Sequence, residues 1–245
     1  MRVVLVAVSS LALMLLSAVA FHPVLGAEAP RLGQLSYGIE WRLIHAGTAL
    51  INIGDGQGTV KLDSGGLVSA LYKVDDLYTV HYDDGFCVTS SVLDGKEGNR
   101  HRRLEVTVER YNNRAAFIER DVLKGATMAS GQIEVPSCVH DVLGAIHALR
   151  AMTVPPGQSV NLPMSDGRHA AMVKVEAQER EDVTTPAGTF HTIRYEPNMM
   201  NGVVYGRKGR VFLWLTDDAR KMPVQIRLRL AFPIGTVTLQ LEKGL

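Results

Sequence analysis

Apolar and polar residues alternate with a period of two along most of the chain. Apolar side chains occupy every second position in residues 37–43, 104–108, 222–230 and 237–241. This period predicts β-strands that bury one face and expose the other to water. A solvated face is typical of antiparallel sheets rather than parallel ones. The pattern therefore predicts a mainly β protein built on an antiparallel sheet.

Short turn sequences separate these strands at hairpin spacing. They include Asn112-Asn113, Asp166-Gly167, and the segments 186–188 and 217–221. Asn, Asp, Gly and Pro favour the backbone conformations of tight turns. The chain shows no sign of the long crossovers that parallel strands require. We therefore expect a meander of neighbouring strands in one domain.

One segment, residues 139–152, has a helical period instead. Its apolar residues recur at spacings of three and four, with Pro136-Ser137 before it and Pro155-Pro156-Gly157 after it. These features predict an amphipathic helix with defined ends. Residues 66–72 fit either a short helix or a strand.

Residues 211–215 are apolar at every position, unlike the strands around them. Such a run indicates a central strand covered on both faces, or a strand with one face on an apolar cavity. The second interpretation points to a function, with Phe212 and Trp214, or their neighbours on the opposite face, lining the cavity.

The N-terminal segment has the features of a secretory signal peptide. Arg2 precedes the apolar residues 3–20, and small residues place the cleavage site after Ala20, Gly26 or Ala29. We interpret residues 1–26 as the signal peptide and residues 27–245 as a single β-rich domain in the periplasm. An uncleaved anchor is the alternative, because residues 3–25 are long enough to span a bilayer. A lipoprotein needs a cysteine at the cleavage site, and the first cysteine is Cys87.

Charge argues against nucleic acid as a partner. The chain has 26 Lys and Arg against 25 Asp and Glu, and loss of Arg2 with the signal peptide leaves 25 of each. A neutral chain has no net field to concentrate a polyanion. The glycine-rich segment 54–58 precedes a strand pattern rather than a helix, so it predicts a turn and no nucleotide site.

The predicted export determines how the two cysteines are interpreted. In an oxidising compartment, Cys87 and Cys138 are expected to form one disulfide. The alternative is a nucleophilic Cys138 assisted by His140. No acidic partner for that pair is evident, so we favour the disulfide.

Other candidates for chemistry have simpler explanations. His140 and His147 lie two helical turns apart, roughly 10 Å, which is too far for one zinc ion. Three pairs of adjacent aspartates occur in turn-like contexts, and Asp217-Asp218 is the best of them for acid and base catalysis. Basic clusters at residues 100–103 and 207–210 could meet lipid headgroups, but interleaved acids favour a solvated face. We predict no catalytic residue, metal or cofactor.

Several segments together resemble an exported bacterial family known as domain of unknown function 3108. The more specific ones are the turn Thr185-Pro186-Ala187-Gly188-Thr189-Phe190 and the hairpin that begins Leu213-Trp214-Leu215-Thr216-Asp217-Asp218. Residues 37–41, 46–47, 71–78 and 136–143 leading to Arg150 complete the resemblance, which spans nearly the whole mature chain. The family has no established activity, so it assigns no functional residue.

The resemblance implies a curved antiparallel sheet, or a partly open barrel, wrapped around one main α-helix. That arrangement is similar to the periplasmic lipoprotein carriers, whose sheet holds acyl chains against a helix. We therefore expect a non-enzymatic protein that binds an apolar ligand, a lipid or an envelope protein. The expected cavity lies between the helix and the sheet, lined by Val142, Ile146, Leu149, Phe212 and Trp214. The alternatives are an envelope structural or assembly factor without a ligand and, less favoured, an envelope hydrolase.

Overall fold

A computed structural model of the protein describes residues 31–54, 56–199, 209–231 and 235–244. The predicted signal peptide and its candidate cleavage sites lie outside these residues. The strands are β1 (Gly33–Trp41), β2 (Ile44–Gly54), β3 (Gln57–Ser64), β4 (Val74–Tyr82), β5 (Val88–Glu97), β6 (Arg100–Glu109), β7 (Arg114–Asp121), β8 (Ala126–Glu134), β9 (Ser159–Ser165), β10 (Ala170–Thr185), β11 (Gly188–Pro197), β12 (Gly209–Thr216), β13 (Pro223–Leu230) and β14 (Thr236–Gly244). The helices are α1 (Gly66–Leu71), α2 (Val142–Ala151) and the short 3₁₀ turns η1 (Asp84–Phe86) and η2 (Arg110–Asn112).

All fourteen strands belong to one antiparallel sheet. Its order is β8-β7-β6-β5-β4-β3-β2-β1-β14-β13-β12-β11-β10-β9, so nearly every strand pairs with its neighbour in sequence. The first strand also pairs with the last, as Tyr37 with Leu241 and Ile39 with Leu239. The predicted antiparallel meander is confirmed.

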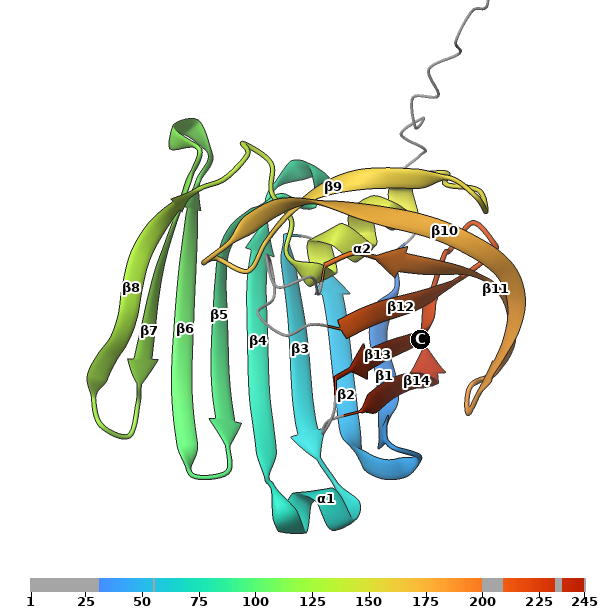
Figure 1. Ribbon diagram of the computed structural model, residues 1–245, viewed down its shortest axis with the longest axis horizontal. Helices are drawn as coiled ribbons and strands as arrows, with labels where there is room; N and C mark the ends of the chain where they lie inside the picture. Colours follow the sequence, from blue (N-terminus) through green and yellow to red (C-terminus); the bar gives the residue numbers. More distant parts are fainter. Residues whose placement is uncertain (1–30, 55, 200–208, 232–234, 245) are drawn as a thin grey trace, which may run out of the picture.

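The sheet is strongly curved and does not close. Strands β2–β8 run side by side down the page in Figure 1, whereas β9–β11 cross the top of the picture with α2 beneath them. The sheet ends at β8 and β9, which do not pair with each other. The chain between these two edge strands contains α2. The expectation of a partly open barrel wrapped around one main helix is therefore confirmed.

Helix α2 packs against both parts of the sheet. Leu143 joins a buried cluster that includes Tyr37, Ala49 and Val80 from the β1–β5 part. Leu149 joins a second cluster, formed by β9–β13. A third, smaller cluster around Val106, Ala115, Val135 and Val139 lies under the connection from β8 to α2. Burial of these apolar surfaces is the main source of folding free energy.

The structure decides the open choice at residues 66–72 and corrects the start of the main helix. Residues 66–71 form the helix α1 rather than a strand, and α2 begins at Val142, three residues after the predicted start. Residues 139–141 are extended instead, because His140 pairs with Met164 of β9. Among the described residues, no helix has the length and apolar character needed to cross a bilayer.

Candidate functional site

The start of α2 is fixed by a buried carboxylate. Asp141 is the N-cap residue, and its Oδ1 accepts a hydrogen bond from the Gly144 amide at 2.8 Å. The hydroxyl groups of Tyr78 and Tyr82 donate to the same carboxylate at 2.9 and 3.1 Å. Burial raises the pKa of Asp141, and these hydrogen bonds oppose the rise. The N-cap interaction and the two tyrosines together hold the helix start against β4.

Glycine at position 144 allows a close approach between α2 and the η1 turn. A Cβ atom added there would lie 2.7 Å from the carbonyl oxygen of Phe86. The same carbonyl contacts His140 Nδ1 at 2.8 Å. The chain entering the helix is therefore packed directly on this turn.

The predicted disulfide between Cys87 and Cys138 is present, with the two Cα atoms 4.9 Å apart. It ties the start of β5 to the segment that enters α2. The Val88 amide donates to the Val139 carbonyl at 2.9 Å, which extends this connection. Because the Cys138 sulfur is bonded to Cys87, the alternative of a free nucleophile beside His140 is ruled out for this state.

The end of α2 is held by a buried arginine. Arg150 is only 1% exposed, and its guanidinium donates to the carbonyl oxygens of Arg220 and Lys221 at 2.8 to 3.2 Å. Burial lowers the pKa of Arg150 to about 10, so the side chain stays charged at neutral pH. Its contacts attach the helix to the turn between β12 and β13.

His147 lies beside Arg150 on the same side of the helix. Arg150 Nη1 is 3.4 Å from His147 Nδ1, and the Phe86 ring packs on the imidazole with centroids 4.3 Å apart. Burial, assisted by the positive charge of Arg150, lowers the pKa of His147 to about 4. The imidazole is therefore neutral at physiological pH. His140 and His147 share no metal site, and the described residues contain no group of three metal-ligating side chains.

The opposite side of α2 faces an apolar cavity of about 70 Å³. Every residue that lines it is apolar. They are Val142, Ala145, Ile146 and Leu149 of α2, Leu162 and Met164 of β9, Val175 of β10, Pro197 and Met199 at the end of β11, Val211 and Leu213 of β12, and Ile226 of β13. The cavity thus lies between the helix and the β9–β13 part of the sheet.

Burial differs between the floor and the mouth of this cavity. Leu162, Met164 and Val175 on the floor are buried. Val142, at the first turn of the helix, is 38% exposed. The cavity therefore reaches the described surface at the start of α2.

The structure brings three of the five predicted cavity residues together and places the other two elsewhere. Val142, Ile146 and Leu149 line the cavity, but Phe212 and Trp214 lie on the other face of β12. There the Trp214 indole nitrogen donates to Glu181 at 2.8 Å. The residues that face the cavity from this strand are Val211 and Leu213.

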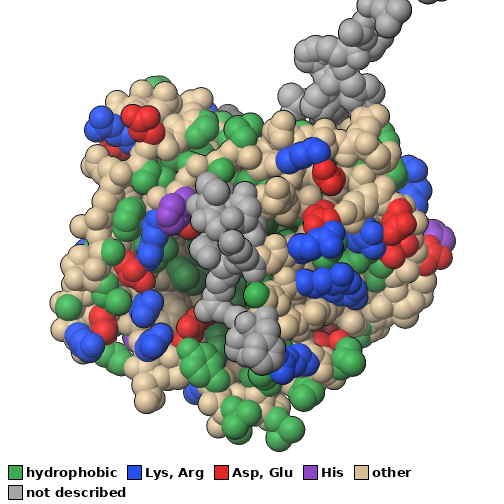
Figure 2. Space-filling model, viewed as in Figure 1, with side chains coloured by type: hydrophobic (Ala, Val, Ile, Leu, Met, Phe, Trp, Pro, Cys, Tyr) green, Lys and Arg blue, Asp and Glu red, His purple; other side chains and the backbone are tan. Residues whose placement is uncertain are grey.

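Arginines cover the Phe212 and Trp214 face. Guanidinium groups lie over the Phe212 ring from Arg210 at 4.8 Å and Arg229 at 5.1 Å, and Arg227 lies 5.1 Å from the Trp214 ring. Figure 2 shows Lys and Arg side chains gathered over this part of the sheet. Cation–π contact and the aliphatic stems of the arginines shield the two rings from water. This explains how β12 is buried on both faces although one of them points outward.

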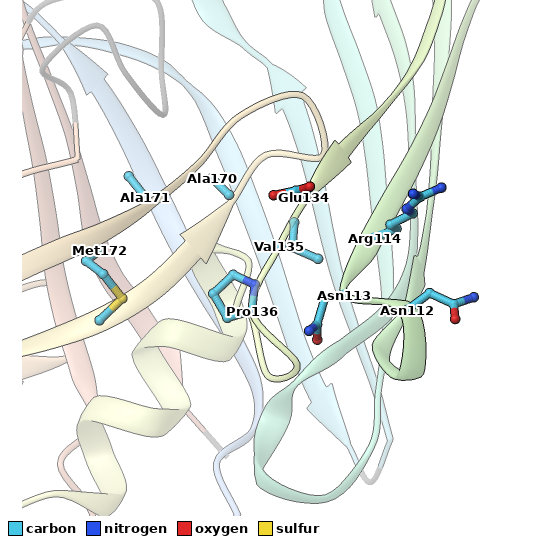
Figure 3. A pocket seen from close by; sticks show the side chains of 9 residues that line it. All are labelled: Asn112, Asn113, Arg114, Glu134, Val135, Pro136, Ala170, Ala171 and Met172. Carbon is cyan, nitrogen blue, oxygen red and sulfur yellow. The ribbon is translucent and has the colours of Figure 1, made fainter.

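A larger hollow of about 620 Å³ lies near the opening of the sheet. It is lined by residues of mixed character from η2, β7, the end of β8 and the start of β10, among them Arg114, Glu134, Val135 and Met172 (Figure 3). The side chains of Arg114 and Asn112 point away from Met172 rather than toward a common centre. We regard it as an open groove of mixed character and take the cavity beside α2 as the candidate site, because ligand sites are lined mainly by apolar side chains.

The candidate catalytic carboxylates act as turn and ion-pair residues. Asp218 accepts hydrogen bonds from the Thr216 hydroxyl and the amides of Arg220 and Lys221 within the β12–β13 turn. Asp217 pairs with Arg180 at 2.7 Å. Each side chain has a local structural partner, and the two do not converge on one point.

The fold and the site define an open β-barrel-like protein with a helix packed inside its curved sheet. The chain belongs to the family described as Protein of unknown function (DUF3108), whose sequence profile matches residues 36–242. No curated protein matches the chain.

Two solved structures are similar to this chain at low sequence identity. A β-barrel-like protein of the domain of unknown function DUF1849 from Brucella abortus has a TM-score of 0.58 and 10% identity, covering 88% of this chain and 98% of its own. A DUF1089 family protein from Pseudomonas aeruginosa has a TM-score of 0.41 and 12% identity, covering 75% of this chain and 90% of its own. The first similarity is strong enough to support the fold and does not assign a function.

Proposed function

We propose that this protein is a non-enzymatic, exported protein that binds an apolar ligand between α2 and the β9–β13 part of the sheet. The observation that carries this proposal is the cavity with twelve apolar lining residues and a mouth at Val142. Apolar surface removed from water contributes roughly 25 cal/mol per Å², so such a site binds through burial rather than charge.

The shape of the cavity favours a single hydrocarbon chain. Ligand pockets usually measure about 300–1,000 Å³, and this cavity measures about 70 Å³. A ligand must therefore displace lining side chains as it enters. Met164 and Met199 are suited to that role, because unbranched thioether side chains repack with little strain. A flexible acyl chain needs less displacement than a rigid ring system.

Two features support an exported location. The Cys87–Cys138 disulfide is typical of oxidising compartments such as the periplasm. The apolar residues 3–20 and the small residues after them are typical of a signal peptide. We therefore propose that the protein is located in the periplasm.

The small volume of the cavity also supports a second candidate, an envelope structural or assembly factor with no ligand. Mass spectrometry separates the two. The protein is exported, purified without detergent and measured intact under native conditions, and an organic extract is then analysed. We expect a bound lipid or fatty acid near one per protein. A protein mass without adduct and an empty extract would favour the factor without a ligand.

A matched pair of variants assigns the ligand to the cavity. Val142→Asp places a carboxylate at the mouth, and the first turn of a helix tolerates this charge because it complements the helix dipole. Met172→Asp introduces the same charge at another exposed apolar residue, in the open groove. We expect Val142→Asp to lower the affinity for a fluorescent fatty acid at least tenfold and Met172→Asp to leave it unchanged. The reverse result would place the ligand in the open groove.

A further inference from the structure

Four connections between strands lie at one end of the sheet. They are residues 42–43, 65–73, 98–99 and 122–125, and we call them the leucine rim. Figure 1 shows them along the lower edge of the molecule, with α1 at the bottom. The Gly98 amide donates to the Lys73 carbonyl at 2.7 Å, which joins two neighbouring connections, and the Val122 amide donates to the carbonyl of His101 in β6 at 2.8 Å. With about 4.8 Å between strands, the eight strands β1–β8 make this rim about 34 Å wide.

Large apolar side chains on the leucine rim point into solvent. Leu43 is 91% exposed, Leu71 83%, Leu67 74% and Leu123 68%. Leu67 and Leu71 lie one turn apart on α1, and this helix has no buried residue. Single exposed apolar residues are common on protein surfaces, but these four occupy three connections of one continuous edge. Figure 2 shows hydrophobic side chains along that lower edge.

The charges of the leucine rim have one sign. Its connections contain Arg42, Lys73 and Lys124 and no Asp or Glu. Acids at the neighbouring strand ends have partners of their own. Asp63 and Asp75 pair with Lys61, Asp121 pairs with Lys124 at 3.6 Å, and Glu97 accepts from the Tyr72 hydroxyl at 3.2 Å, so Arg42 and Lys73 are the rim cations that these acids do not pair with. At the opposite end, Asp83 of the connection 83–87 pairs with Arg110 of the connection 110–113.

We infer that the leucine rim docks on the surface of an anionic phospholipid bilayer. Exposed leucines beside lysines and arginines match such a surface, since the apolar side chains enter the boundary between headgroups and acyl chains while the cations stay near phosphate. These leucines bury little surface in the protein, so a contribution to the stability of the fold does not explain why they are present. The inference depends on the rim alone and does not require the cavity or its ligand.

Flotation with vesicles of phosphatidylglycerol and phosphatidylethanolamine tests this inference. One variant replaces Leu43, Leu67, Leu71 and Leu123 by Ser, and its control replaces the exposed Tyr111 and Met172 by Ser. We expect the leucine variant to lower the partition coefficient at least tenfold and the control to leave it unchanged. Lys73→Gln should lower it about fivefold, because each cation near the surface contributes about fivefold. All variants should keep the thermal unfolding midpoint of the parent chain.

A second measurement locates the docked face. Leu71→Trp places an indole on the leucine rim, and Tyr111→Trp places one at the opposite end of the sheet. Vesicles with brominated acyl chains should quench the fluorescence of Leu71→Trp and spare that of Tyr111→Trp. Because both chains share residues 1–30, any membrane affinity of that segment is the same in each. Equal quenching, or partition that the leucine variant does not change, would overturn the inference and leave a protein partner as the occupant of the rim.

Discussion

The two sides of α2 are held in different ways. On one side, Arg150 and His147 are buried polar residues, and Arg150 donates hydrogen bonds to two carbonyl groups of the β12–β13 turn. On the other side, Ala145, Ile146 and Leu149 meet an apolar cavity and form no directional contact with the sheet. The first side fixes where the helix lies, and the second leaves space beside it.

This difference explains how a helix can keep its position above an incompletely filled space. Hydrogen bonds are directional, so Asp141 at one end of α2 and Arg150 at the other define its position. Hydrophobic burial is not directional and allows the side chains on the cavity side to repack. A ligand can therefore exchange with those side chains while the helix stays attached.

The largest expected effect comes from removing the polar attachment. Arg150→Met keeps most of the buried stem and deletes the donors to Arg220 and Lys221. Hydrogen bonds to a charged group contribute about 1.5–3 kcal/mol each, so we expect a loss of about 3 kcal/mol in the free energy of unfolding, measured with urea. The control Arg229→Met removes an exposed guanidinium and one contact with Phe212, and should cost less than about 1 kcal/mol. Equal losses would show that the hydrogen bonds of Arg150 contribute no more to stability than an exposed guanidinium does.

Acid should lower the stability of the protein through His147, which lies on the same side of α2 as Arg150. The folded pKa of His147 is about 4, below its ordinary value of 6.5. Between these two values the unfolded chain binds a proton that the folded chain does not, so stability falls as the pH falls through this window. We expect His147 to account for about 2 kcal/mol of loss between pH 7 and pH 4.5.

His147→Gln isolates this contribution, because glutamine can still accept a hydrogen bond from Arg150 and does not titrate. The free energy of unfolding of this variant should depend less on pH than that of the parent by the same amount. His191→Gln, at a side chain that is 88% exposed, serves as the control and should follow the parent. A pH dependence unchanged in His147→Gln would mean that the imidazole is not held neutral by burial. Burial also lowers the pKa of His140, so some acid sensitivity should remain.

The sequence pattern was sufficient for most of the fold. Period-two alternation predicted the strands, and hairpin turns predicted that neighbours in sequence pair. The helical spacing from Val139 predicted α2, although the pattern included three residues that are extended in the structure. His140 pairs there with Met164, a contact between segments distant in sequence that periodicity does not report.

The cavity was only partly predictable because a β-bulge decides which face of β12 meets the helix. Leu215 pairs with Pro223, whereas Trp214 pairs with Gln225, so the register shifts by one between them. Without this shift Trp214 would pair with Val224, which is buried in the core, rather than with Gln225. A one-residue shift exchanges the two faces of a strand. The alternation in β13 indicated that Arg227 and Arg229 point outward. It did not indicate which residues of β12 lie on the same face as these arginines.

The cavity side of α2 should accept extra volume that the rest of the helix cannot. Ala145 lines the cavity, and Ala148 is buried in the same cluster without lining it. Ala145→Leu adds three carbon atoms toward the empty space, so we expect a change in the free energy of unfolding below about 1 kcal/mol together with loss of fatty-acid binding. Ala148→Leu adds the same atoms where the packing is complete and should cost about 1–3 kcal/mol. Urea unfolding and fluorescent fatty-acid titration of both variants provide the measurement. If Ala145→Leu proves as costly as Ala148→Leu, the space beside α2 is not available to a ligand, and the two sides of the helix are equally filled.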